Sequence, residues 1–153
     1  MPARTSRDHV EGQLEGPYTA VFPARRDAFG RMCTFIEETC ARTAVRRHDC
    51  LRLILLIEEL FTNTVVHGHG RDSEAPVRLA LMVTPPAIGV QYEDTARPYN
   101  PFASVSAPSD SDDVDQRRVG GLGIALITTM AEEVGYVRRD EWNQIRFRLR
   151  LSG

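Results

Sequence analysis

The sequence predicts an α+β fold with two layers, in which helices lie on one face of a mixed, largely antiparallel sheet. Three observations predict it. Apolar residues recur at helical spacings of three and four over residues 24–43 and 50–66. They alternate over 77–92 and again over 134–149, each time about a short turn. The resulting order of helices, hairpin, helix and hairpin is typical of a two-layer sandwich.

Composition limits the function classes. The 153 residues suit one domain, and 42% hydrophobic with 26% charged residues is ordinary for a globular chain. Nineteen basic and 21 acidic residues give a net charge of −2, which argues against direct nucleic-acid binding because such binding needs a basic face. No apolar run is long enough for a membrane span. Cys33, Cys40 and Cys50 have no CxxC spacing, so we expect reduced thiols in a cytoplasmic protein.

The first elements are a tail, a strand and a helix. Residues 1–16 are polar, and we expect a flexible N-terminal tail without a secretory signal, followed by a single domain over 17–153. Weak alternation predicts a strand over 18–22, and a helix follows over about 24–43. The apolar stripe of this helix comprises Phe29, Met32, Phe35, Ile36 and Cys40.

A second helix is predicted over 50–66, with Asp49 as its N-cap. From Leu51 to Phe61 it is apolar on nearly every side, which indicates a helix buried against a sheet. The glycines at 68 and 70 end it.

The second half predicts two hairpins with a long connection between them. The strands are predicted over 77–83, 88–92, 134–139 and 144–149. Residues 95–119 hold three prolines and several aspartates, and a connection of this length inside a compact domain is usually functional or mobile. A helix is predicted over 124–132.

Glu59 and Asn63 form the first candidate site. They are four residues apart on a helix and therefore share a face. Burying a carboxylate and an amide without partners costs on the order of a few kcal/mol, so the pair needs partners. Asn63 would offer its carbonyl oxygen to a hard cation, and Glu59 would act as a base or orient water. The alternative is a solvent-facing stripe with Glu58 and Glu59 on its rim.

Asp94 is the second candidate. By the period of two it continues the apolar face of Ile88, Val90 and Tyr92, where an acid needs a partner. The exocyclic amino group of a purine would suit. The alternative is a turn aspartate that accepts hydrogen bonds from nearby backbone amides.

The third candidate is the glycine cluster Gly120, Gly121 and Gly123 before a helix. Glycines let a ligand approach the backbone, and a helix N-terminus favours a phosphate. A simple turn explains the glycines equally well. No GK[ST] follows and no strand leads directly into the cluster, so it is neither a Walker A loop nor a good Rossmann fingerprint.

An acid for a base, an amide oxygen for a metal and a glycine turn for phosphates together make a complete nucleotide site. At this point the arrangement resembles the GHKL ATPase superfamily, which has the Bergerat (histidine-kinase-like) fold. EELFTNTVVHG (58–68) resembles its N box, EDTARPYNP (93–101) its DxGxPFDP segment, and GGLGIALITTMAEEVGY (120–136) its closing glycine box. The spacing and the small size are most similar to RsbW-like anti-sigma factor serine kinases, and the resemblance covers roughly residues 18–150.

The resemblance implies a role for each matching residue. Glu59 matches the acid that acts as general base, Asn63 the asparagine that binds magnesium, and Asp94 the aspartate that accepts from the adenine amino group. Gly121 and Gly123, with Gly120 beside them, match the glycines that approach the phosphates.

The connection also has counterparts in the family. Residues 99–119 match the lid that closes over ATP, and Arg117 and Arg118 at its end are candidates for a phosphate contact or for plain solvation. Ala96 stands beside the base where the family has glycine, so its methyl group either crowds the base or is tolerated. Asn100 stands where the family has aspartate. The lid is also rich in aspartates, which repel a triphosphate unless they point outward or share a cation.

The resemblance therefore implies ATP and Mg²⁺ as cofactors and a serine/threonine-protein kinase as the activity. Its implied partners are a STAS-type anti-anti-sigma protein, which it phosphorylates, and a sigma factor, which it sequesters. The implied working unit is a homodimer. Two alternatives keep the same fold: a non-catalytic ATP-binding or partner-switching module, and a detached histidine-kinase ATPase domain.

Overall fold

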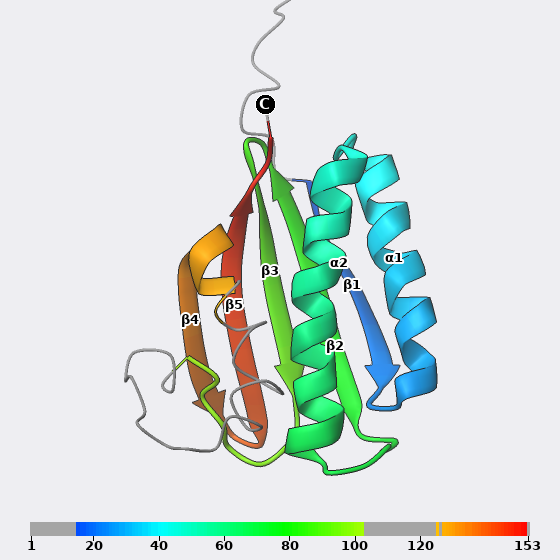
Figure 1. The fold of residues 1–153 in the computed structure, drawn as a ribbon, viewed down its shortest axis with the longest axis vertical. Helices are drawn as coiled ribbons and strands as arrows, with labels where there is room; N and C mark the ends of the chain where they lie inside the picture. The colour runs from blue at the N-terminus through cyan, green and yellow to red at the C-terminus, as the bar shows by residue number, and fades with distance from the viewer. Residues whose placement is uncertain (1–14, 103–124, 126, 153) are drawn as a thin grey trace, which may run out of the picture.

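The computed structural model describes residues 15–102, 125 and 127–152, and they form two layers (Figure 1). The described strands make one sheet in the order β1-β2-β3-β5-β4. They are β1 (Glu15–Pro23), β2 (Pro76–Thr84), β3 (Ala87–Asp94), β4 (Ala131–Arg139) and β5 (Trp142–Arg150). Helices α1 (Phe29–Arg42) and α2 (Arg47–Thr62) lie on one face of the sheet. The predicted α+β sandwich is confirmed, and every pairing among the described strands is antiparallel rather than mixed.

Alternation along the strands builds the core between the layers. The predicted inward residues of the first hairpin are buried, and β5 adds three more. These residues are Val77, Leu79, Leu81, Val83, Ile88, Val90, Tyr92, Ile145, Phe147 and Leu149. Helices α1 and α2 cover them with Met32, Ile36, Leu53, Leu56 and Leu60. Asp94 follows Tyr92 on this same buried face, as its position in the strand predicts.

The start of the chain departs from prediction at two boundaries. Strand β1 begins at Glu15, so residues 15 and 16 belong to the sheet and not to the tail. Helix α1 begins at Phe29 after the short 3-10 helix η1 (Arg26–Ala28), and not at residue 24. The backbone of Ala24 explains the late start, because its N–H and C=O bond to Ala75 and Ser73, each at 2.9 Å. A residue paired in this way with a distant segment is not available to a helix.

Helix α2 also begins elsewhere than the sequence predicts. It starts at Arg47, and its N-cap is the extended Arg46, so Asp49 is not the cap. Asp49 lies in the first turn with only 1% of its surface exposed. Leu51 and Leu55 are 49% and 43% exposed, so the helix has an open face that its apolar sequence does not predict. At its C-terminal end the helix changes to a π-helix, η2 (Asn63–Gly68).

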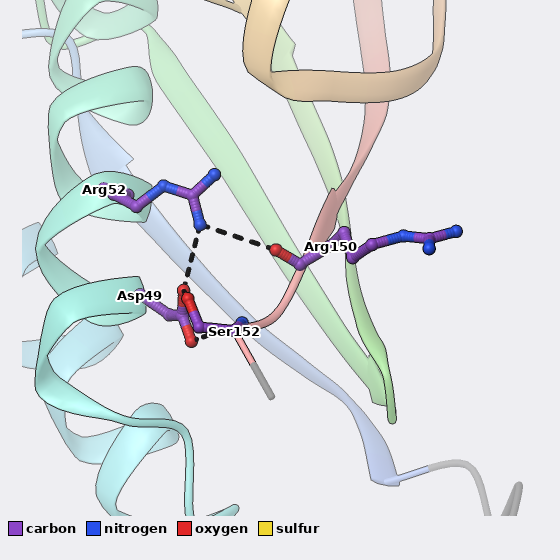
Figure 2. Close-up of polar contacts among 4 residues, drawn as sticks. All are labelled: Asp49, Arg52, Arg150 and Ser152. Atoms are coloured by element: carbon purple, nitrogen blue, oxygen red, sulfur yellow. Dashed lines mark hydrogen bonds and ion pairs between the residues drawn. The ribbon is translucent and has the colours of Figure 1, made fainter.

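Asp49 joins the first turn of α2 to the end of β5 (Figure 2). Its carboxylate accepts hydrogen bonds from the Ser152 backbone N–H at 3.0 Å and from the Ser152 hydroxyl at 2.9 Å. Arg52 donates to the same carboxylate at 2.9 Å and to the carbonyl of Arg150 at 3.5 Å. We call these four residues the Asp49 clamp. Burial alone would raise the pKa of Asp49, but the hydrogen bonds from Ser152 and Arg52 hold it below its ordinary value.

The last hairpin begins earlier than predicted. The sequence predicts a helix up to residue 132, whereas strand β4 starts at Ala131. Cross-strand ion pairs explain the change. Glu132 pairs with Arg150 at 3.4 Å and Glu133 pairs with Arg148 at 3.2 Å, and both partners lie on β5. These tertiary contacts override the helix preference of alanine and glutamate.

The other face of the sheet is not covered by α1 or α2 (Figure 1). On it the Arg78 guanidinium lies over the ring of Trp142, 3.8 Å from the ring centroid. A hollow of about 830 Å³ also lies on this face, and Ala80, Gly89 and Gly135 are among its lining residues. Among the residues that the structure describes, no predicted site residue lines this hollow.

Candidate functional site

Of the predicted site residues that the structure describes, Asn63, Asp94 and Ala96 line one pocket near the C-terminal ends of α2 and β3, whereas Glu59 does not line it. Helix α2 supplies Glu59, and the π-helix that continues it supplies Asn63 and Thr64. Strand β3 supplies Asp94 as its last residue. A π-helix is rare and is frequent at functional sites, because the wider turn repositions the side chains that follow it.

Asn63 has an unusual side chain. Its Oδ1 atom is buried and accepts no hydrogen bond in the described part of the chain. A buried polar atom without a partner is uncommon in folded proteins and costs stability. An amide oxygen of this kind is a ligand that hard cations prefer, so Asn63 fits the Mg²⁺ that the sequence motifs imply.

Glu59 lies one turn before Asn63 and is half-buried, whereas its neighbour Glu58 is exposed. Burial, and then the Glu58 carboxylate, raise the pKa of Glu59. A raised pKa brings a carboxylate nearer to the range in which a general base works well. The structure therefore separates the two glutamates, with Glu58 on the solvent side.

Asp94 is 7% exposed, and both of its oxygens are held. Oδ1 accepts from the Ala96 backbone N–H at 3.1 Å and from Asn143 Nδ2 at 2.8 Å. Oδ2 accepts from the Thr64 hydroxyl at 2.7 Å. Asp94 continues the buried face as its position predicts, and it also accepts from a backbone amide two residues on, as in the turn alternative.

Asn143 fixes the loop that follows β3. Its Nδ2 group also lies 3.0 Å from the carbonyl of Ala96 and 3.1 Å from that of Arg97, while its Oδ1 accepts from the Tyr136 hydroxyl at 2.6 Å. Arg138 donates to the same Ala96 carbonyl at 2.8 Å. These bonds tie the loop to strands β4 and β5.

Ala96 itself is buried against Gly68. A Cβ atom on Gly68 would lie 2.7 Å from the Cβ of Ala96, closer than two carbon atoms tolerate. The methyl group at position 96 therefore requires glycine at position 68. Arg97 joins the same two segments, since its Nη2 donates to the His67 carbonyl at 2.9 Å.

A small pocket opens among these residues. Asn63, Thr64, Asp94, Ala96 and Tyr99 are among those that line it. Its volume is about 30 Å³, room for roughly one or two water molecules. A purine is several times larger than this volume, so it enters only if lining side chains move. Among the lining residues, Arg97 and Tyr99 are the exposed ones, and their side chains are therefore the freest to move.

Part of the predicted site lies outside the described residues: Gly120, Gly121, Gly123, Arg117, Arg118 and lid residues 103–119. The sequence interpretation in turn missed Thr64, Asn143 and Arg138. Asn143 was assigned to a turn, and only the pairing of β3 with β5 brings it opposite Asp94. For Thr64, the sequence offers one indication of a role in the site, namely its position directly after Asn63.

The fold and this site define a class of protein. The chain belongs to the histidine kinase-like ATPase domain family, whose model matches residues 22–149. The resemblance to the GHKL (histidine-kinase-like) ATPases that the three motifs predict is thereby confirmed. Within the described residues, no helix is both long and apolar enough to cross a bilayer.

Known proteins similar to this chain include a protein kinase and a solved structure. The serine/threonine-protein kinase BtrW of Bordetella bronchiseptica is 28% identical over 93 residues, which are 61% of this chain and 65% of that protein. The crystal structure of the RsbU and RsbW domains of Rv1364c from Mycobacterium tuberculosis matches with a TM-score of 0.62 and 16% identity. That match covers 91% of this chain and 33% of the larger one, and it shows the fold.

Proposed function

We propose that the chain is a Mg²⁺- and ATP-dependent protein-serine kinase that phosphorylates a STAS-type anti-anti-sigma protein and sequesters a sigma factor. One observation carries the proposal: a buried carboxylate acceptor, Asp94, and an unpaired buried amide oxygen, that of Asn63, belong to residues lining one pocket. Membership of an ATPase family and the similarity to a serine/threonine-protein kinase support it.

In this proposal Asp94, Asn63 and Glu59 each have a separate role in the reaction. Asp94 accepts a hydrogen bond from the adenine amino group, and Asn63 holds Mg²⁺. The bound ion neutralises charge on the phosphate oxygens. Glu59 takes the proton of a seryl hydroxyl as that oxygen bonds to the γ-phosphorus, and the bond from the γ-phosphorus to the bridging oxygen breaks to release ADP. The raised pKa of Glu59 suits it to this step.

The remaining assignments rest on the family resemblance alone. Gly120, Gly121 and Gly123 approach the phosphates, Arg118 contacts them, and residues 99–119 close over ATP. By the same resemblance the protein works as a homodimer in the cytoplasm, where it regulates transcription through its partners.

A second candidate function is a binding module that captures its partner without transferring phosphate. The pocket volume of about 30 Å³ favours it, as does the methyl group of Ala96 on the pocket wall. Nucleotide binding and phosphate transfer must therefore be measured separately.

Calorimetric titration with ATP, with and without Mg²⁺, tests the binding step. We expect Mg²⁺-dependent binding by the parent protein and its loss in Asn63→Ala, because the variant lacks the amide oxygen. Thr62→Ala is the matched control, since Thr62 is the exposed neighbour and its change leaves the site intact. Absence of binding by the parent would overturn the kinase and leave the binding module.

Phosphate transfer to a STAS-type protein tests the catalytic step. We expect Glu59→Ala to bind ATP normally and to transfer phosphate roughly a hundredfold or more slowly, whereas Glu58→Ala remains active. Acid-stable phosphoserine on the partner supports the proposal, and acid-labile phosphohistidine would identify a histidine kinase instead. Undiminished transfer by Glu59→Ala would show that another group is the base.

A further inference from the structure

A buried row of three oxygen atoms leads from the core into the pocket. The Tyr92 hydroxyl lies 2.6 Å from the Thr64 hydroxyl, which lies 2.7 Å from Oδ2 of Asp94. The exposed fractions of Tyr92, Thr64 and Asp94 are 1%, 3% and 7%. Protons in this row are thus shielded from solvent, and each one must be donated within the row or to a neighbouring acceptor.

The direction of donation follows from the partners. In the described part of the chain, Thr64 is the one hydrogen-bond partner of the Tyr92 hydroxyl, so Tyr92 donates to Thr64. The Thr64 proton then has two acceptors, the Asp94 carboxylate at 2.7 Å and the Leu60 carbonyl at 3.0 Å. The carboxylate is nearer and charged, and Leu60 already accepts the Asn63 backbone N–H, so donation to Asp94 is favoured.

With this bond Asp94 receives three donors, namely Thr64 on Oδ2 and Ala96 and Asn143 on Oδ1. Donors on both oxygens hold the carboxylate in one orientation, and a carboxylate accepts hydrogen bonds and donates none. A group held in that state accepts from an amino group and repels a carbonyl oxygen. The hydroxyl row therefore determines which edge of a base the pocket receives.

We propose that Thr64 and Tyr92 are positioning residues that hold Asp94 as an acceptor and so make the site select a 6-amino purine over a 6-oxo purine. This inference rests on the proposed nucleotide binding, and it identifies the residues that determine which base is bound. A site that hydrogen-bonds one polar group of its ligand strongly rejects an analogue that lacks this group. An apolar pocket discriminates much less between ligands of similar size.

The test compares the affinities for Mg²⁺-ATP and Mg²⁺-inosine triphosphate, whose base has a carbonyl in place of the amino group. For the parent we expect clear preference for ATP. In Thr64→Val, which keeps the shape and removes the hydroxyl, we expect the ATP/inosine triphosphate affinity ratio to fall about tenfold. Thr64→Ser restores the hydroxyl and should keep the ratio within about twofold of the parent's.

Tyr92→Phe provides a second, milder variant, because it removes the donor at the head of the row. We expect the ratio to fall by about threefold, since Thr64 can still donate to Asp94. This variant carries the test if Thr64→Val does not fold.

Thr39→Val is the matched control. Thr39 is also 3% exposed, and its hydroxyl donates to the Phe35 carbonyl four residues before it at 2.8 Å, as the Thr64 hydroxyl lies near the carbonyl of Leu60. It lies on α1 and does not line the pocket. The same change there should leave the ratio unaltered, which separates loss of a buried hydroxyl in general from loss of this one.

The outcomes separate the two proposals. A parent that binds neither nucleotide overturns both. A parent that prefers ATP, together with a Thr64→Val or Tyr92→Phe variant of unchanged preference, overturns this inference and leaves the nucleotide site standing. An equal fall in Thr39→Val would also overturn it, because the effect would then not depend on Asp94.

Discussion

At the scale of single residues, Glu58 and Glu59 are chemically identical neighbours that the fold places in different surroundings. Glu58 is exposed, and Glu59 is half-buried beside it. Since two like charges disfavour each other, Glu58 contributes to the raised pKa of Glu59, after burial. The pair therefore links a surface charge to the ionisation of the proposed base.

Glu58→Gln should move the pH dependence of phosphate transfer. A general base works when deprotonated, so the rate rises with pH through the pKa of Glu59. Removing the Glu58 charge lowers that pKa, and the acidic limb of kcat/KM should shift to lower pH by about a few tenths of a unit, less at high salt. Glu38→Gln, at an exposed glutamate of α1, is the control and should not shift it. A shift to higher pH would contradict the assignment.

The site residues that could be predicted from the sequence are those whose role depends on residues nearby in the chain. Asp94 was predictable because the period of two placed it on an apolar face, and Asn63 because it follows Glu59 by one helical turn. Asn143 was not, because its role depends on the register between β3 and β5. The hydroxyl row of Tyr92 and Thr64 likewise exists only once helix and sheet are packed.

At the scale of elements, the close contact between the π-helix and the loop after β3 depends on two small residues. Gly68 and Ala96 approach so closely that only one of them can have a methyl group without displacement. Position 96 is where the family motif has glycine, so the methyl group on the loop side of this contact is a departure from that motif.

Gly68→Ala should therefore destabilise the protein by about 1–3 kcal/mol through overpacking, and adding Ala96→Gly should recover most of that loss. Urea unfolding of the two single variants and the double variant measures the coupling. Gly30→Ala is the control, because a Cβ there meets nothing within 4 Å and alanine favours a helix. Strictly additive effects of the two changes would contradict the contact.

Element boundaries were the least predictable feature, and two of the displaced boundaries have a tertiary cause. Helix α1 starts late because Ala24 is bonded to the segment before β2. Strand β4 replaces the end of a predicted helix because β5 offers arginines to Glu132 and Glu133. The type and order of the elements were predictable, since apolar periodicity depends on which face is buried and not on these contacts.

At the scale of the whole molecule, α2 and β5 run between two polar clusters. The Asp49 clamp lies at the N-terminal end of α2, and the candidate site lies at its C-terminal end. Helix α2 and the π-helix that continues it supply Asp49 and Thr64, and β5 and the residues that follow it supply Asn143 and Ser152, so the same two segments contribute to both clusters.

The clamp should make stability sensitive to acid. The folded-state pKa of Asp49 lies below its unfolded value, so the ionised group adds stability that is complete above a pH of about 4 and is lost as the pH falls through the folded-state pKa. Asp49→Asn should cost about 2 kcal/mol at neutral pH, with the difference from the parent shrinking in acid. Asp27→Asn, at a side chain 74% exposed, should cost little. A pH-independent deficit would contradict the linkage.

The stacking of Arg78 on Trp142 has a practical consequence for studying the protein. Trp142 is the one tryptophan of the chain, and its ring lies on the face of the sheet away from α1 and α2. The next residue, Asn143, points to the opposite face and donates there to Asp94. Indole fluorescence responds to charge and solvent at the ring. The protein thus contains its own optical probe one residue from the base pocket, and emission at this single ring offers a label-free way to follow the seating of a nucleotide in real time.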